Sequence, residues 1–209
     1  MESKVKIVGH PIHPMLIVFP LGLLTTAVIF DILYLALDQP SFPLVSFWLI
    51  IAGIVGGLVA AVFGLADWLS IPGGTRAKSV GLLHGVGNVV VVALFAVSWF
   101  LRLGSTSYKP GSLALIFSFA AAILALVAGW LGGELVFRLG MAVDPGANLD
   151  APSSLSGQPV TAAPTGRPAS SPDIDRPEAT NLITRDGKIT SAQIMAKIDR
   201  NFLFRGEEV

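Results

Sequence analysis

The chain has 209 residues, of which 53% are hydrophobic and 13% are charged. Soluble domains carry about 25% charged residues, so this composition indicates a membrane protein. The 14 basic side chains balance the 14 acidic ones and there is no cysteine, which excludes a basic field for nucleic acid, disulfides and thiolate metal sites.

Four apolar stretches follow one another along the chain, each long enough to cross a bilayer as a helix of about 20 residues. They cover residues 15–37, 44–69, 80–103 and 113–137. The short connections between them make neighbouring helices antiparallel. The sequence therefore predicts an all-α integral membrane protein with an up-down-up-down four-helix bundle over residues 1–140.

Basic residues are distributed unevenly between the two predicted ends of the bundle. One end carries Lys4, Lys6, Arg76, Lys78 and Arg138, and the other carries Arg102 and Lys109. The positive-inside rule then places both termini in the cytoplasm, and we expect the host membrane to be the bacterial inner membrane.

Glycines recur at a spacing that lets helix backbones approach closely in lipid. The GxxxG pairs are Gly53–Gly57, Gly81–Gly85 and Gly129–Gly133. Because they fall in three successive predicted helices, they indicate a tightly packed bundle.

Two histidines and three prolines stand at the start of the first span, in the stretch GHPIHPMLIVFP. Proline disfavours a helical backbone at the residue before it, so His10 and His13 are both expected to be extended. Pro20 should kink the first span or mark its start.

Polar side chains collect at the predicted cytoplasmic end of the bundle, whereas Asp31 stands alone near the opposite surface. They are His10, His13, Asp67, His84, Asn88, Glu134 and Arg138. Ionisable groups in a membrane are costly, so each is a functional hypothesis.

Three interpretations of this cluster stay open. In the first, which we favour because polar residues at helix ends usually serve structure, Glu134 pairs with Arg138 while Asp67, His84 and Asn88 tie helix ends together. In the second, His84 and His10 or His13 bind haem b or a metal ion, with Asp67 and Glu134 as further ligands. In the third, the cluster lines a proton or ion path.

The composition changes after the fourth span. Residues 141–180 are rich in Pro, Ala, Ser and Gly and predict an extended linker. Residues 181–209 predict a short cytoplasmic docking segment, with an Asp186–Gly187 hairpin signal followed by a short helix. The expected anchors on a partner are Ile183, Ile189, Ile194, Ile198 and Phe202.

Several motifs resemble the bacterial membrane family called domain of unknown function 2231. They are GHPIHPMLIVFPLGLL, GLADWL, LLHGVGN and GWLGGELVFRLG, and the resemblance covers residues 9–155. It implies a four-helix membrane domain, sometimes fused to or found near redox proteins, whose histidines have invited a haem or metal hypothesis. The resemblance implies a histidine, in many members, at each of two positions that are Val18 and Leu139 in this chain. Those two histidines therefore have no counterpart here.

No complete catalytic constellation emerges from the sequence, and no catalytic residue or bound cofactor is predicted. The expectation is a non-catalytic accessory subunit of a larger photosynthetic or respiratory membrane complex. Its partners would be the lipid bilayer and other integral-membrane subunits, with no nucleic acid. The alternative is a haem- or metal-binding redox or ion-handling protein that uses His84 with His10 or His13.

Overall fold

The computed structural model describes residues 1–160 of the chain. The predicted docking segment lies outside these residues. The same is true of its anchors Ile183, Ile189, Ile194, Ile198 and Phe202.

Four helical segments of the described chain are long and apolar enough to cross a membrane, which confirms the predicted bundle. The first consists of α1 (Ile12–Leu16) and α2 (Val18–Leu37), and the second is α3 (Phe42–Ser70). The third is α4 (Arg76–Arg102). The fourth is α5 (Ser112–Gly133), continued by one π-helical turn, η2 (Glu134–Arg138).

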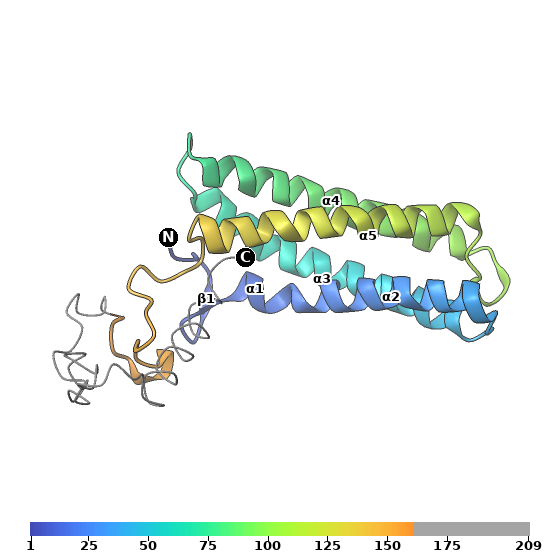
Figure 1. Ribbon diagram of the computed structural model, residues 1–209, viewed down its shortest axis with the longest axis horizontal. Coiled ribbons are helices and arrows are strands. Elements are labelled where there is room, and N and C mark those ends of the chain that lie inside the picture. The colour runs from blue at the N-terminus through green and yellow to red at the C-terminus, as the bar shows by residue number, and fades with distance from the viewer. Residues whose placement is uncertain (161–209) are drawn as a thin grey trace, which may run out of the picture. The chain divides into compact units, whose positions relative to one another are not determined.

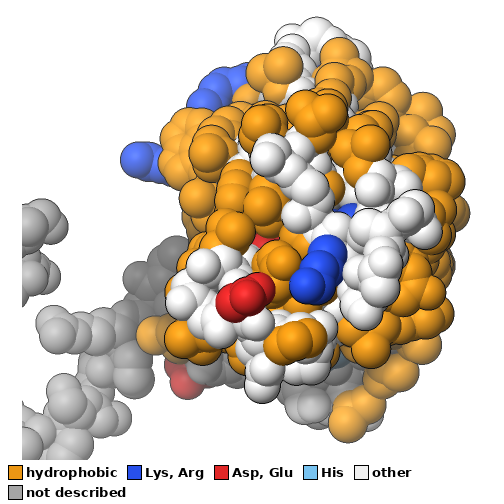
Figure 2. Space-filling model, turned by 90° about the vertical axis from the view of Figure 1, so that its right-hand side faces the viewer, with side chains coloured by type: hydrophobic (Ala, Val, Ile, Leu, Met, Phe, Trp, Pro, Cys, Tyr) orange, Lys and Arg blue, Asp and Glu red, His pale blue; other side chains and the backbone are white. Residues whose placement is uncertain are grey.

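The helices run antiparallel in chain order, and Figure 1 shows them as two hairpins, α2 with α3 and α4 with α5. The contact between α3 and α4 is broader than that between α2 and α5. Seven buried residues form the core between the hairpins: Leu24, Ala27, Ile50, Ile54, Val91, Phe95 and Ala121. Viewed from the end opposite the N-terminus, the flanks of the bundle are almost entirely hydrophobic (Figure 2).

The first span is interrupted at Ile17, between α1 and α2. Pro20 lacks the N–H that would bond to the carbonyl of Leu16, so the predicted kink has a direct cause. His10 lies in the short strand β2 (His10–Pro11), paired with β1 (Lys6–Ile7), and is extended as expected. The same prediction is wrong for His13, which lies in α1. Pro14 follows it in the first helical turn, where no backbone N–H is needed.

The three GxxxG pairs do not act alike. A Cβ added at Gly53 would lie 2.6 Å from the Leu24 side chain, and one at Gly57 would lie 3.4 Å from Val92, so this pair does bring helices together. In the other two pairs, Gly85 and Gly129 have nothing within 4 Å. Only in α3, therefore, do both glycines of a GxxxG pair lie against a neighbouring helix.

The bundle predicts opposite membrane faces for two exposed serines. Ser107 lies in η1 (Thr106–Tyr108), between α4 and α5, and Ser154 lies in η3 (Ser154–Ser156), after α5. The chain has no native cysteine. We therefore expect the single variants Ser107→Cys and Ser154→Cys to react with a membrane-impermeant maleimide from opposite sides of sealed vesicles. Labelling of both from one side would contradict the four-span topology.

Candidate functional site

The most deeply buried polar site is an ion pair between Asp31 of α2 and Arg102 of α4. Both side chains are 0% exposed. The two terminal nitrogens of Arg102 donate to the two carboxylate oxygens of Asp31, at 2.8 Å and 2.6 Å. Such a two-bond fork between guanidinium and carboxylate is strong and fixes the orientation of both groups.

Three serines from three helices complete this site. Arg102 also donates to the hydroxyls of Ser46 at 3.1 Å and of Ser98 and Ser118 at 3.2 Å. Ser98 donates in turn to the carbonyl of Ala114 at 2.7 Å. Every one of the four spans thus contributes to one connected polar network, and within residues 1–160 only Nε of Arg102 in this network has no partner.

The sequence expectations do not include this network, because in them Asp31 is an isolated acid and Arg102 is a basic residue at the end of a span. The sequence nevertheless contains a usable signal, because the first and third spans of an up-down-up-down bundle run parallel. A lone acid near the end of one and a lone base at the same end of the other are therefore expected to meet.

At the other end of the bundle two histidines face each other. The rings of His13 and His84 have centroids 6.5 Å apart and are nearly perpendicular, at 89°. Nδ1 of His13 lies 2.9 Å from the carbonyl of Ala60, and Nδ1 of His84 lies 2.9 Å from that of Ala128. A carbonyl can only accept, so Nδ1 carries the proton in each ring and, in the neutral form, Nε2 is an acceptor. The amide nitrogen of Asn88 lies 3.3 Å from Nε2 of His84 and can donate to it.

Each of these rings packs against a glycine one turn beyond its carbonyl partner. A Cβ at Gly64 would lie 2.8 Å from Cε1 of His13, and a Cβ at Gly132 would lie 3.0 Å from Cε1 of His84. Because glycine has no Cβ at these two positions, each imidazole can contact the backbone of the neighbouring helix directly.

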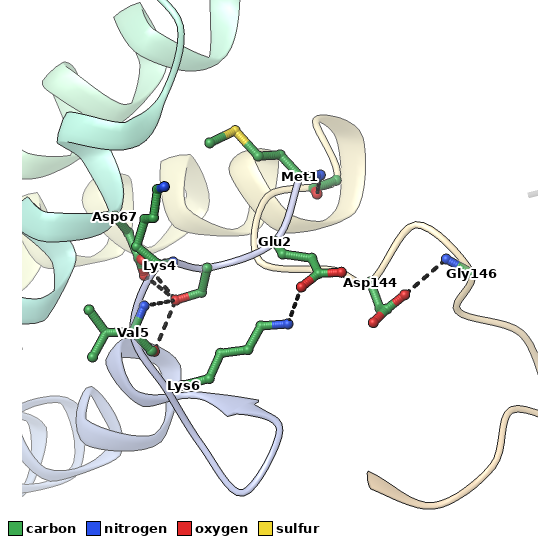
Figure 3. Close-up of polar contacts among 10 residues, drawn as sticks. Met1, Glu2, Lys4, Val5, Lys6, Asp67, Asp144 and Gly146 are labelled. Carbon is green, nitrogen blue, oxygen red and sulfur yellow. Dashed lines mark hydrogen bonds and ion pairs between the residues drawn. The ribbon is translucent and has the colours of Figure 1, made fainter. Parts of the chain in front are cut away.

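Asp67 holds the N-terminal segment to the end of α3 (Figure 3). Its carboxylate accepts from the hydroxyl of Ser3 at 2.7 Å and 2.9 Å, and from the backbone N–H of Lys4 at 2.8 Å. These bonds use both carboxylate oxygens and hold the first residues of the chain against the C-terminal end of α3.

The remaining predicted residues separate into local contacts. Glu134 pairs with Arg76 at 2.5 Å, whereas the expected partner, Arg138, is exposed on the same π-helical turn. The expected Glu134–Arg138 pairing is therefore wrong. The amide of Asn88 donates to the backbone carbonyl of His84, one turn earlier, at 2.8 Å.

His10 lies 3.2 Å from the hydroxyl of Ser154, through its Nε2, and its contacts are thus with the segment after α5. Of the predicted ligands, His13 and His84 are brought together, while Asp67 and Glu134 are held by other partners. No group of three or more potential metal ligands forms within residues 1–160. The larger predicted ligand set, with Asp67 and Glu134 beside the histidines, is therefore not assembled within these residues.

Comparison with known protein families gives a match to the four-helix domain. The family described as "Predicted membrane protein (DUF2231)" matches residues 9–145, a stretch that contains all four spans and both polar sites. No curated protein and no solved structure matches the chain.

Proposed function

The chain belongs to the DUF2231 family of membrane proteins, and we propose that it is a non-catalytic accessory subunit of a larger bioenergetic membrane complex, photosynthetic or respiratory. It would act by packing its outer helix faces against other integral-membrane subunits and by docking its C-terminal segment on a partner.

The observation that carries this proposal is that the buried polar groups of the spans bond to one another inside the bundle. Asp31 and Arg102 are 0% exposed and are paired with each other, so this network offers no surface to a substrate. The outer surface instead presents large apolar side chains along every span, among them Leu58, Val89 and Leu126. Polar groups that are paired inside and apolar side chains that face outward suit a protein that packs against neighbours in the bilayer.

The start of the tail is fixed to one end of the bundle. The terminal amine of Met1 donates to the carbonyl of Gly140 at 3.0 Å, and Ala142 donates back to Met1 at 2.9 Å. Asp67 holds the same N-terminal segment through Ser3. We propose that this anchored end faces the cytoplasm of the bacterial inner membrane, as the positive-inside rule predicts, and that residues 181–209 reach a partner from it.

Truncation tests the docking role. We expect the full-length chain, purified from native membranes in mild detergent, to bring other integral-membrane proteins with it. Removal of all residues after Ser156, or only of those after Thr180, should release the same partners, because both truncations lose the docking segment. The described four-helix domain is intact in both, so each truncated chain should still be recovered from the membrane. Migration of the full-length chain alone, or retention of every partner by both truncations, would contradict the proposal.

A second candidate, a haem- or metal-binding membrane protein, is favoured by the His13–His84 pair. Histidines that bind metal usually donate their other ring N–H to a carbonyl or carboxylate, and both rings donate from Nδ1 to a backbone carbonyl. A bound metal or haem would supply electron transfer. The two imidazoles would bind it through Nε2, while Gly64 and Gly132 would keep the rings in place.

An absorption spectrum separates the two candidates. We expect the purified chain to show no Soret or α-band with or without dithionite, because Val18 and Leu139 replace two histidines of the family pattern. Metal analysis of the same sample should show no stoichiometric transition metal. A reduced haem spectrum or a metal, stoichiometric with protein and lost in His84→Ala but kept in His10→Ala, would establish the second candidate instead.

A further inference from the structure

The buried residues of the first hairpin recur in the second at a constant separation. In the first and third spans, each buried residue of α2 has a buried counterpart in α4 that lies 71 positions later in the sequence. The pairs are Leu24 with Phe95, Ala27 with Ser98, and Asp31 with Arg102. His84 follows His13 by the same 71 positions.

The second and fourth spans repeat in the same way, with a separation of 68 positions. Four of the seven buried residues of α3 correspond to buried residues of α5. The pairs are Ser46 with Ala114, Ile50 with Ser118, Gly53 with Ala121, and Ala60 with Ala128. Gly132 follows Gly64 by the same 68 positions.

Contacts repeat along with the positions. In each hairpin a histidine of the first helix bonds to an alanine carbonyl of the second at 2.9 Å and packs on the glycine one turn later. The first members of the two hairpins, α2 and α4, run parallel and lie diagonally in the bundle. Equivalent residues of the first and third spans meet in the middle, as His13 of α1 meets His84 and Asp31 meets Arg102.

From these repeats we infer that the domain is two variants of one helical hairpin, related by an approximate twofold axis along the bundle, and that Asp31 and Arg102 make unlike hairpins recognise each other. The symmetry is approximate, because the contact between α3 and α4 is broader than the equivalent one between α5 and α2. The interaction surface is the inner face of each hairpin, and its partner is the hairpin of opposite charge. Two copies of the first hairpin would bring two carboxylates together on the axis, and two copies of the second would bring two guanidinium groups together. Like charges in a dry interface repel, so only the mixed pair is stable.

A nicked form of the full chain tests this inference. A protease site inserted between Gly73 and Gly74, which are exposed in the α3–α4 connection, allows the two hairpins to be separated covalently after purification in mild detergent. With an affinity tag on the first fragment, we expect the second fragment to co-elute after cleavage. Asp31→Arg and Arg102→Asp alone should each release most of the second fragment. Asp38→Arg, an exposed acid seven residues after Asp31, is the matched control and should release none.

The decisive variant exchanges both charges, as Asp31→Arg with Arg102→Asp. Because the two positions are equivalent about the axis, the exchanged pair should again hold the fragments together. If a single variant does not survive purification, recovery of the exchanged variant in its place gives the same support. Separation of the unmutated fragments on cleavage, or an exchanged variant no better than either single one, would overturn the inference.

Discussion

One buried ion pair constrains the arrangement of the whole bundle. A carboxylate and a guanidinium that have left water are costly in a membrane unless they are paired and their remaining hydrogen bonds are made. Asp31 and Arg102 meet this requirement, apart from Nε of Arg102, only if α2 and α4 face each other at one depth and if α3 and α5 turn their serines inward. The ion pair therefore fixes, for each helix, its rotation, its depth in the membrane and the helix that it faces.

The opposite end of the bundle is organised by weaker and more exposed contacts. There, His13 and His84 bond to backbone carbonyls of neighbouring helices, and Asp67 binds the N-terminal segment. This segment in turn holds the residues that follow α5. The molecule thus has a tightly fixed end and an end where the chain termini of the described domain are gathered, and the proposed docking segment continues from the second.

The spans followed from the sequence because hydrophobic length in a membrane leaves few alternatives. The partners of polar residues did not. Glu134 has a local candidate in Arg138, one turn away, but Arg76 at the start of another helix takes that place. Asp31 and Arg102 are 71 residues apart in sequence, and helix rotation, which the weakly amphipathic spans leave undetermined, decides whether they meet. His13 shows the limit of a local rule, since a proline after it did not prevent a helix.

The central claim is that Asp31 and Arg102 stabilise the bundle as a pair, and a double-mutant cycle measures this most directly. The free energy of unfolding in mixed micelles would be determined for Asp31→Asn, Arg102→Gln and the double variant. Each single change leaves a buried charge unpaired and is expected to cost about 3–5 kcal/mol, while the double variant should cost little more than either. Single effects that add to within about 0.5 kcal/mol in the double variant would contradict the account.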